Sequence, residues 1–130
     1  MRYLGIDYGA KRIGLALSDE EKHLAFPYRT IHNTKTLFNE ITAVIKQEGV
    51  ERIVVGLPVP FSGGESEQTR KVKKFMEKLK KISGVPVDTE NEIFTTKMAE
   101  RSGIASKHID KAAAAIILQS CLDKKRAIKG

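Results

Sequence analysis

Three acidic residues stand at positions from which their side chains could act together. Asp7 ends an apolar run, Glu92 lies a few residues beyond a second one, and Asp110 begins an alanine-rich segment. Sites in open α/β sheets form beyond the carboxyl ends of the strands, so we expect Asp7 and Glu92 to reach one edge of a sheet. Carboxylates at close range repel one another, and a hard divalent cation relieves that repulsion. The combination therefore predicts a site for a metal such as Mg²⁺, which binds carboxylates together with substrate phosphates.

Each of these acids also has an ordinary interpretation. Asp7 could form a turn before Gly9, and Glu92 could be a surface loop residue. Asp110 could be the N-cap of the last helix. Only the three acids taken together favour a metal site.

The positive charge of the chain is concentrated in two segments. The formal net charge is +7, and residues Arg70 to Lys81 contain seven bases and one acid. Four further bases lie between Lys124 and Gly130. Phosphate groups need cations for affinity, so this pattern favours a polyanion such as nucleic acid as partner. The alternative is a solvated lysine-rich helix face and a basic tail.

Other chemistries have less support. His23, His32 and His108 lack the spacing of zinc ligands, and Cys121 is the single cysteine. We interpret Cys121 as a small core residue and expect a reducing, cytoplasmic location. No apolar run approaches the ~20 residues needed to cross a bilayer, so we expect no membrane partner. Aromatic residues make up 6% of the chain with no Trp, so we do not expect base stacking to be the main mode of nucleic-acid recognition.

The hydrophobic pattern predicts the order β-β-β-α-β-α-β-α-α. Alternating and β-branched runs predict strands over Tyr3–Asp7, Ile13–Ser18, Ala25–Ile31, Arg52–Gly56 and from Val85. Apolar residues at helical spacing predict one helix from Asn33 or Thr34 to Gly49, and a second before Gly84 that buries Val72, Phe75, Met76 and Leu79. A short helix over Thr95–Arg101 and an Ala-rich helix over Asp110–Leu122 follow.

These elements predict the α/β class. We expect one mixed five-stranded sheet, made of an antiparallel hairpin and parallel strands and flanked by helices. The third strand carries Pro27, which favours the edge of the sheet. Residues 1–130 are expected to form one domain. Residues 124–130 are expected to be a basic tail, with a composition typical of disordered segments.

Four motifs carry a resemblance to a known family. They are D-Y-G-A-K-R-I-G-L-A at Asp7–Ala16, G-L-P at Gly56–Pro58, N-E-I-F-T-T at Asn91–Thr96 and D-K-A-A-A-A-I-I-L-Q at Asp110–Gln119. With these motifs the chain resembles the YqgF/RuvX family along almost its whole length. The resemblance implies an RNase H-like fold and a nuclease that matures the 5′ end of pre-16S ribosomal RNA. An older assignment for the family is Holliday junction resolution.

The chain departs from the family pattern beside the central acid. Asn91 and Ile93 stand where the family usually has Asp and Arg, and Pro60 and Gln68 stand where a polar residue and an Arg are common. Loss of an Arg removes a bidentate phosphate contact, so substrate binding or rate could be reduced.

The resemblance implies that Asp7, Glu92 and Asp110 are the catalytic, metal-binding acids. We expect them to hold two Mg²⁺ or Mn²⁺ ions, one activating water and one stabilising the leaving 3′ oxygen. The expected substrate-binding residues, which would contact the phosphate backbone, are Gly9, Lys11, Arg12, Arg70, Lys71, Lys74 and Lys78.

The leading hypothesis is a metal-dependent phosphodiesterase that acts on RNA. A nuclease for branched DNA, a non-catalytic nucleic-acid-binding module and an ATPase of the actin and hexokinase type are the alternatives, and the last would need a second domain to close over its nucleotide. We expect an RNA precursor or branched DNA as partner, transient association with the ribosome, and a monomer or weak homodimer.

Overall fold

The computed structural model describes residues 1–57, 66–91 and 106–129 of the 130-residue chain. For Asn91, 106–110 and 126–129 it describes the backbone alone. The described elements are β1 (Arg2–Tyr8), β2 (Arg12–Ser18), β3 (Ala25–His32), α1 (Leu37–Glu48), β4 (Val50–Leu57), α2 (Glu67–Ser83), β5 (Val87–Asn91) and α4 (Ser106–Lys129). The helix predicted over Thr95–Arg101 lies outside the described residues.

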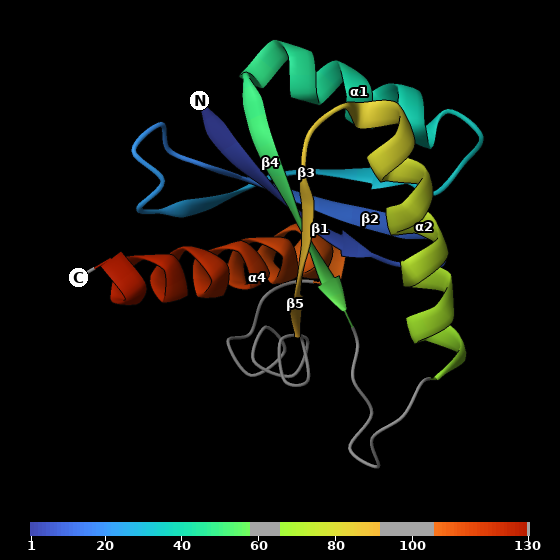
Figure 1. Ribbon diagram of the computed structural model, residues 1–130. Coiled ribbons are helices and arrows are strands. Elements are labelled where there is room, and N and C mark those ends of the chain that lie inside the picture. The colour runs from blue at the N-terminus through green and yellow to red at the C-terminus, as the bar shows by residue number, and fades with distance from the viewer. Residues whose placement is uncertain (58–65, 92–105, 130) are drawn as a thin grey trace.

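The five strands form one mixed sheet in the order β3-β2-β1-β4-β5. β1, β2 and β3 are antiparallel neighbours, whereas β4 is parallel to β1 and to β5. Helices α1 and α2 cover one face of the sheet and α4 covers the other (Figure 1). The predicted hairpin, parallel strands and edge position of the Pro27 strand are confirmed.

Two apolar layers hold the sheet between its helices. On the α1 and α2 face, strand residues such as Leu4, Ile6 and Ile53 pack against the helical residues that the sequence pattern assigns to the core. The layer under α4 combines small residues, with Ala16 and Ala114 fully buried in it, and larger ones such as Leu118. Glycines end two of the helices, since Gly49 and Gly84 adopt φ values of 63° and 72° that favour glycine.

Three helix boundaries differ from the prediction. Helix α1 begins at Leu37 with Thr36 as N-cap, and neither Asn33 nor Thr34 caps it. The Asn33 side chain instead donates to the carbonyl oxygen of Gly9, a contact between distant segments that the local pattern does not contain.

Helix α4 begins at Ser106, before the predicted start at Asp110, so Asp110 lies inside the helix and is not its N-cap. At the other end the helix continues past the predicted end at Leu122 and reaches Lys129, so residues 124–129 of the expected basic tail are helical. Lys124 pairs with Glu90 of β5, and the Lys125 ammonium lies 5.7 Å from the centre of the Tyr3 ring, so contacts with the sheet favour the helix beyond its apolar part. None of the helices in the described ranges is long and apolar enough to span a membrane.

Candidate active site

Asp7 lies near the carboxyl end of β1, the central strand of the sheet, and its side chain is half-buried. It pairs with Gly14 of β2, and Gly56 of β4 comes one residue after Val55, which pairs with Ile6. Side chains alternate along a strand, and Gly5 contacts α4, so Asp7 is on the α4 face. Both neighbouring strands therefore carry a glycine, which has no side chain, beside this carboxylate.

Helix α4 crosses the sheet antiparallel to β1. Lys125 lies over Tyr3 near the start of β1, and Ala114 and Leu118 lie against Gly5. A Cβ atom on Gly5 would be 2.9 Å from the carbonyl oxygen of Ala114, so the helix and the strand are in direct contact. The backbone of Asp110 is one helical turn before Ala114, in the direction in which β1 runs towards Asp7.

The third predicted acid, Glu92, lies outside the described residues, immediately after the last residue of β5. The acids of β5 that the structure does describe, Asp88 and Glu90, are both ion-paired. Asp88 accepts a hydrogen bond from Arg52, and Glu90, only 7% exposed, accepts from Ser120 Oγ at 3.3 Å and from Lys124 Nζ. Asp88 therefore holds β5 against β4, and Glu90 holds it against α4.

Two pKa shifts reflect this packing. The hydrogen bond to Glu90 raises the pKa of Lys124 above its usual value, which keeps the cation of the pair charged. Burial raises the pKa of the Cys121 thiol, as expected for a structural cysteine. The predicted core position of Cys121 is confirmed, since it is 7% exposed.

The turn between β1 and β2 has a geometry that requires glycine. A Cβ atom on Gly9 would lie 2.4 Å from the carbonyl oxygen of Arg12. Asn33 fixes this turn twice, because its Nδ2 donates to Gly9 O at 2.9 Å and its backbone N–H donates to Lys11 O at 2.9 Å. The side chains of Lys11 and Arg12 are exposed on the braced turn, close in sequence to Asp7.

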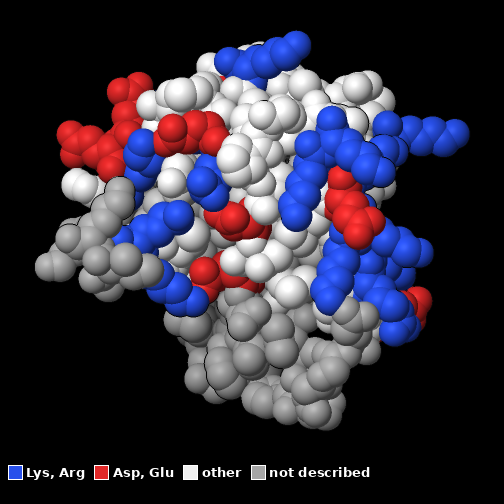
Figure 2. All heavy atoms as spheres, viewed as in Figure 1, with Lys and Arg blue, Asp and Glu red and all other residues white. Residues whose placement is uncertain are grey.

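The basic residues of α2 form an exposed face, which we call the lysine face. Figure 2 shows Lys and Arg side chains gathered over this helix, on the right of the view. Ser66 caps the start of the helix, accepting from the N–H of Thr69 at 3.1 Å. Lys71 lies 3.7 Å from Glu67, one turn earlier. The members of the lysine face are Arg70, Lys71, Lys73, Lys74, Lys78, Lys80 and Lys81.

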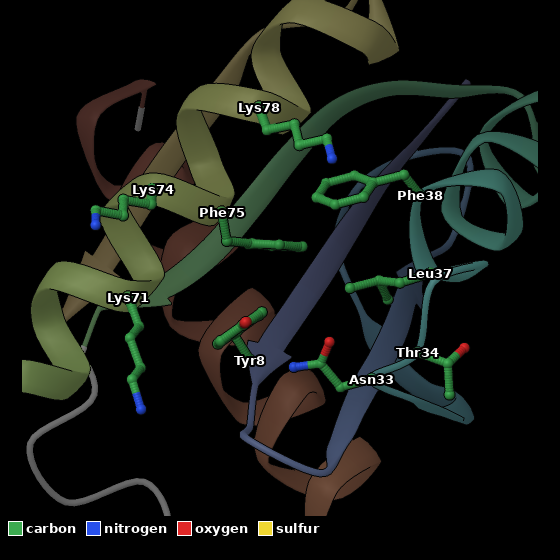
Figure 3. A pocket seen from close by; sticks show the side chains of 9 residues that line it. All are labelled: Tyr8, Asn33, Thr34, Leu37, Phe38, Lys71, Lys74, Phe75 and Lys78. Carbon is green, nitrogen blue, oxygen red and sulfur yellow. The ribbon is translucent and has the colours of Figure 1, made fainter.

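A cavity of about 320 Å³ lies between α1, α2 and the end of β1. Tyr8, Phe38 and Phe75 supply three aromatic rings to it, and Lys71, Lys74 and Lys78 line it from α2 (Figure 3). Tyr8 follows Asp7 directly but has its side chain on the opposite face of the sheet. The sequence contains no local signal for this cavity, since the cavity depends on the packing of segments far apart in the chain.

The chain matches known proteins along most of its length. A family model described as "RuvX: Holliday junction resolvase" matches residues 1–124. The chain belongs to the RuvX family. A relative from Anaplasma marginale, named "Putative pre-16S rRNA nuclease", is 42% identical over 94% of this chain and 84% of its own length. A relative of the same name from Endomicrobium trichonymphae is 40% identical, over 94% and 95% of the two chains.

Solved structures agree with the fold expected for a RuvX-family nuclease. RuvC of Thermus thermophilus in complex with a Holliday junction superposes with a TM-score of 0.64 at 14% identity, over 98% of this chain and 96% of that one. The fowlpox virus resolvase bound to Holliday junction DNA gives 0.59 at 13% identity, over 96% and 99%. The predicted RNase H-like fold and the predicted family are confirmed.

The described residues contain one of the three predicted metal ligands with its side chain. Among the side chains that the structure describes, those of residues 1–57, 66–90 and 111–125, no three His, Cys, Asp or Glu are close enough together to hold a metal ion. Asp7 is described in full, Asp110 only by its backbone, and Glu92 not at all. The assignment of all three as ligands stays a prediction for this member of the RuvX family.

Proposed function

We propose that this chain is a metal-dependent nuclease that hydrolyses phosphodiester bonds in an RNA precursor, at the 5′ end of pre-16S ribosomal RNA. The observation that carries the proposal is the half-buried carboxylate of Asp7 at the carboxyl edge of the sheet, flanked by glycines. Helix α4 runs from this edge with Asp110 one turn before its contact with Gly5. The names of the RuvX-family relatives support the substrate.

We propose that Asp7, Glu92 and Asp110 hold the metal ions. All three are carboxylates, the ligands that Mg²⁺ and Mn²⁺ prefer. When bound, two such ions would activate a water molecule and stabilise the leaving 3′ oxygen. Gly14, which pairs with Asp7, has no side chain that would compete with a metal or a phosphate for this position.

The chain's own cations would hold the substrate strand. Lys11 and Arg12 are exposed on the turn beside Asp7, and Gly9 gives that turn its tight shape. The lysine face of α2 adds a second group of exposed cations. Contacts with phosphates fix the register of a strand without reading its sequence, so the position of the cut must be set by other features of the RNA.

Neutralising part of the lysine face tests this role. Replacement of Lys71, Lys74 and Lys78 together by glutamine should weaken binding to all RNA sequences to a similar degree. The slope of log affinity against log salt should fall by up to ~0.7 per lost phosphate contact on a single strand, about 2 in total. Fluorescence anisotropy of labelled RNA over a series of salt concentrations would measure both effects.

The matched control removes the same charge elsewhere. Replacement of Arg2, Arg29 and Lys46 by glutamine takes three cations from β1, β3 and α1, away from α2. We expect the control to keep most of the salt slope. An unchanged slope in the α2 variant would show that the lysine face is only a solvated surface.

Cleavage assays with both candidate substrates test the function itself. The second candidate is a Holliday junction resolvase, which the description of the matched family and the fold of RuvC favour. The purified chain with Mg²⁺ or Mn²⁺ should cut a pre-16S RNA fragment near its 5′ end and leave a four-way DNA junction intact. Preference for the junction would contradict the RNA proposal and support the alternative.

The proposal carries expectations about the setting of the protein. A nuclease for a ribosomal RNA precursor would work in the cytoplasm and associate transiently with the ribosome. The buried free thiol of Cys121 fits a reducing compartment. We propose a monomer or weak homodimer as the active form, since the proposed acids and cations all come from one chain.

A further inference from the structure

The cavity between α1 and α2 has a continuous aromatic surface. The Phe75 ring lies 4.6 Å from that of Tyr8 and 5.6 Å from that of Phe38, measured between ring centres. Phe75 is buried, whereas Tyr8 and Phe38 are half-buried and keep part of their surface towards the cavity (Figure 3). Three of the eight aromatic residues of the chain line this cavity, so base stacking is available here although aromatic residues are rare in the chain as a whole.

Lysines of α2 lie along one side of that aromatic surface. Lys71, Lys74 and Lys78 line the cavity from α2, and Lys78 Nζ lies 4.6 Å from the centre of the Phe38 ring. Lys78 is exposed, and at an exposed site such a cation–π contact contributes about 0.5–1 kcal/mol. Stacking of a base on an aromatic ring contributes about 1–3 kcal/mol, so a base can replace the ammonium over Phe38.

The combination of rings and ammonium groups matches one chemical class. A nucleotide has an aromatic base and an anionic phosphate, and the cavity offers a partner to each. A volume of about 320 Å³ is at the small end of ligand sites, which suits one nucleotide rather than two stacked ones. A nucleotide in a duplex has both base faces stacked, so only an unpaired one can enter.

The cavity lies next to the proposed site of cleavage. Tyr8 and Asp7 are consecutive residues of β1 with side chains on opposite faces of the sheet. A strand that passes over the carboxyl end of β1 can therefore place a phosphodiester near Asp7 and a neighbouring nucleotide beside Tyr8. Asn33, which bonds to Gly9 two residues after Asp7, also lines the cavity.

We propose that this cavity binds one unpaired nucleotide of the substrate strand, with the base against Phe38 and Tyr8 and the phosphate near Lys71. The proposal rests on the proposed function, because it gives the nuclease a subsite that selects single-stranded RNA beside the bond to be cut. The nuclease would then cut where an unpaired segment meets the lysine face, whatever the identity of the bases.

Binding measured without divalent metal tests the subsite separately from cleavage. The probe is a labelled ten-nucleotide single-stranded RNA, compared with an oligomer of the same phosphate backbone that lacks all bases. With the full chain in EDTA, the intact RNA should bind about fivefold to about 150-fold tighter than the abasic one, the range expected for one stacked base. Equal binding of the two probes would overturn the proposal, and this comparison needs no variant.

A variant assigns the effect to the cavity. F38L removes a ring and keeps an apolar side chain, so it should lower affinity for the intact RNA about fivefold or more and leave affinity for the abasic oligomer unchanged. F26L is the control, since Phe26 is 47% exposed on the edge strand β3, outside the cavity. It should bind both probes as the original protein does.

Two results keep this proposal distinct from the proposed function. In the first, the original protein cleaves the RNA precursor, thermal unfolding shows that F38L is folded, and F38L binds intact RNA as tightly as the original protein does. The subsite proposal is then wrong and the nuclease assignment stands. If neither substrate is cleaved with metal present but the base-dependent binding is found, the subsite stands and the nuclease assignment fails.

Discussion

Replacement of Asp7 by asparagine should lower the rate of RNA cleavage about a thousandfold or more in a protein that remains folded. Asparagine has nearly the same shape as aspartate but no charge, so it fits the half-buried position opposite Gly14 and is a poor metal ligand. Metal ions supply several kcal/mol of transition-state stabilisation, and each 1.36 kcal/mol corresponds to a factor of ten in rate. Single-turnover cleavage of a pre-16S RNA fragment would measure the loss.

The matched control is the same substitution at Asp123. This residue is exposed on α4 and accepts a hydrogen bond from Gln119 Nε2 at 3.0 Å, so Asp123→Asn removes one carboxylate far along the helix from Asp110. It should cleave at the original rate. A folded Asp7→Asn protein with cleavage within about tenfold of the original would exclude Asp7 as an essential ligand.

The fold could be predicted from local patterns because most of its elements have clear periodicity. Residues such as Leu37 and Ile41 fall on one face of α1, and glycine marks the ends of α1 and α2. The apolar run ending at Asp7 and the turn at Gly9 predict the hairpin, which the register confirms. These signals are short in range, so one sequence contains them.

Features that depend on contacts between distant segments could not be predicted in this way. Asn33 is a reasonable N-cap by local rules, but its side-chain amide donates a hydrogen bond to the carbonyl oxygen of Gly9, in the turn between β1 and β2. The length of α4 depends on pairing of Lys124 with Glu90, a residue of another element. In both cases a tertiary contact outweighs the local preference.

The candidate site divides in the same manner. An acid that abruptly ends an apolar strand predicts Asp7 as a site residue, and the structure gives it a half-buried position on the α4 face, with glycine on both neighbouring strands. The lysine face follows from composition alone, and the exposure of its residues agrees with that prediction. The aromatic cavity is lined by residues 8, 38 and 75, and their spacing in the sequence does not predict that they lie together.

The close contact between β1 and α4 leads to a second large expected effect. Replacement of Gly5 by valine should lower the free energy of unfolding by about 3 kcal/mol, the upper part of the range for overpacking a core. A Cβ atom at this position would be 2.8 Å from Leu118 Cβ and 2.9 Å from Ala114 O, and the second is a backbone atom that moves only with the helix. Thermal unfolding should show a melting temperature lower by about 10 °C.

Displacement of α4 should also affect chemistry, because the helix carries Asp110 one turn before the contact. Gly5→Ala, with a smaller side chain, should lose less stability than Gly5→Val and still cleave RNA more slowly than the original protein at a temperature where it is folded.

The control is Gly49→Ala. It has no atom within 4 Å of the new methyl group but a φ of 63°, so it costs about 1–2 kcal/mol through backbone strain alone. Gly49→Ala should therefore have a lower melting temperature than the original protein but cleave RNA at the original rate while it is folded. Cleavage by Gly5→Ala at the original rate would show that the position of α4 on Gly5 does not set the geometry of the site.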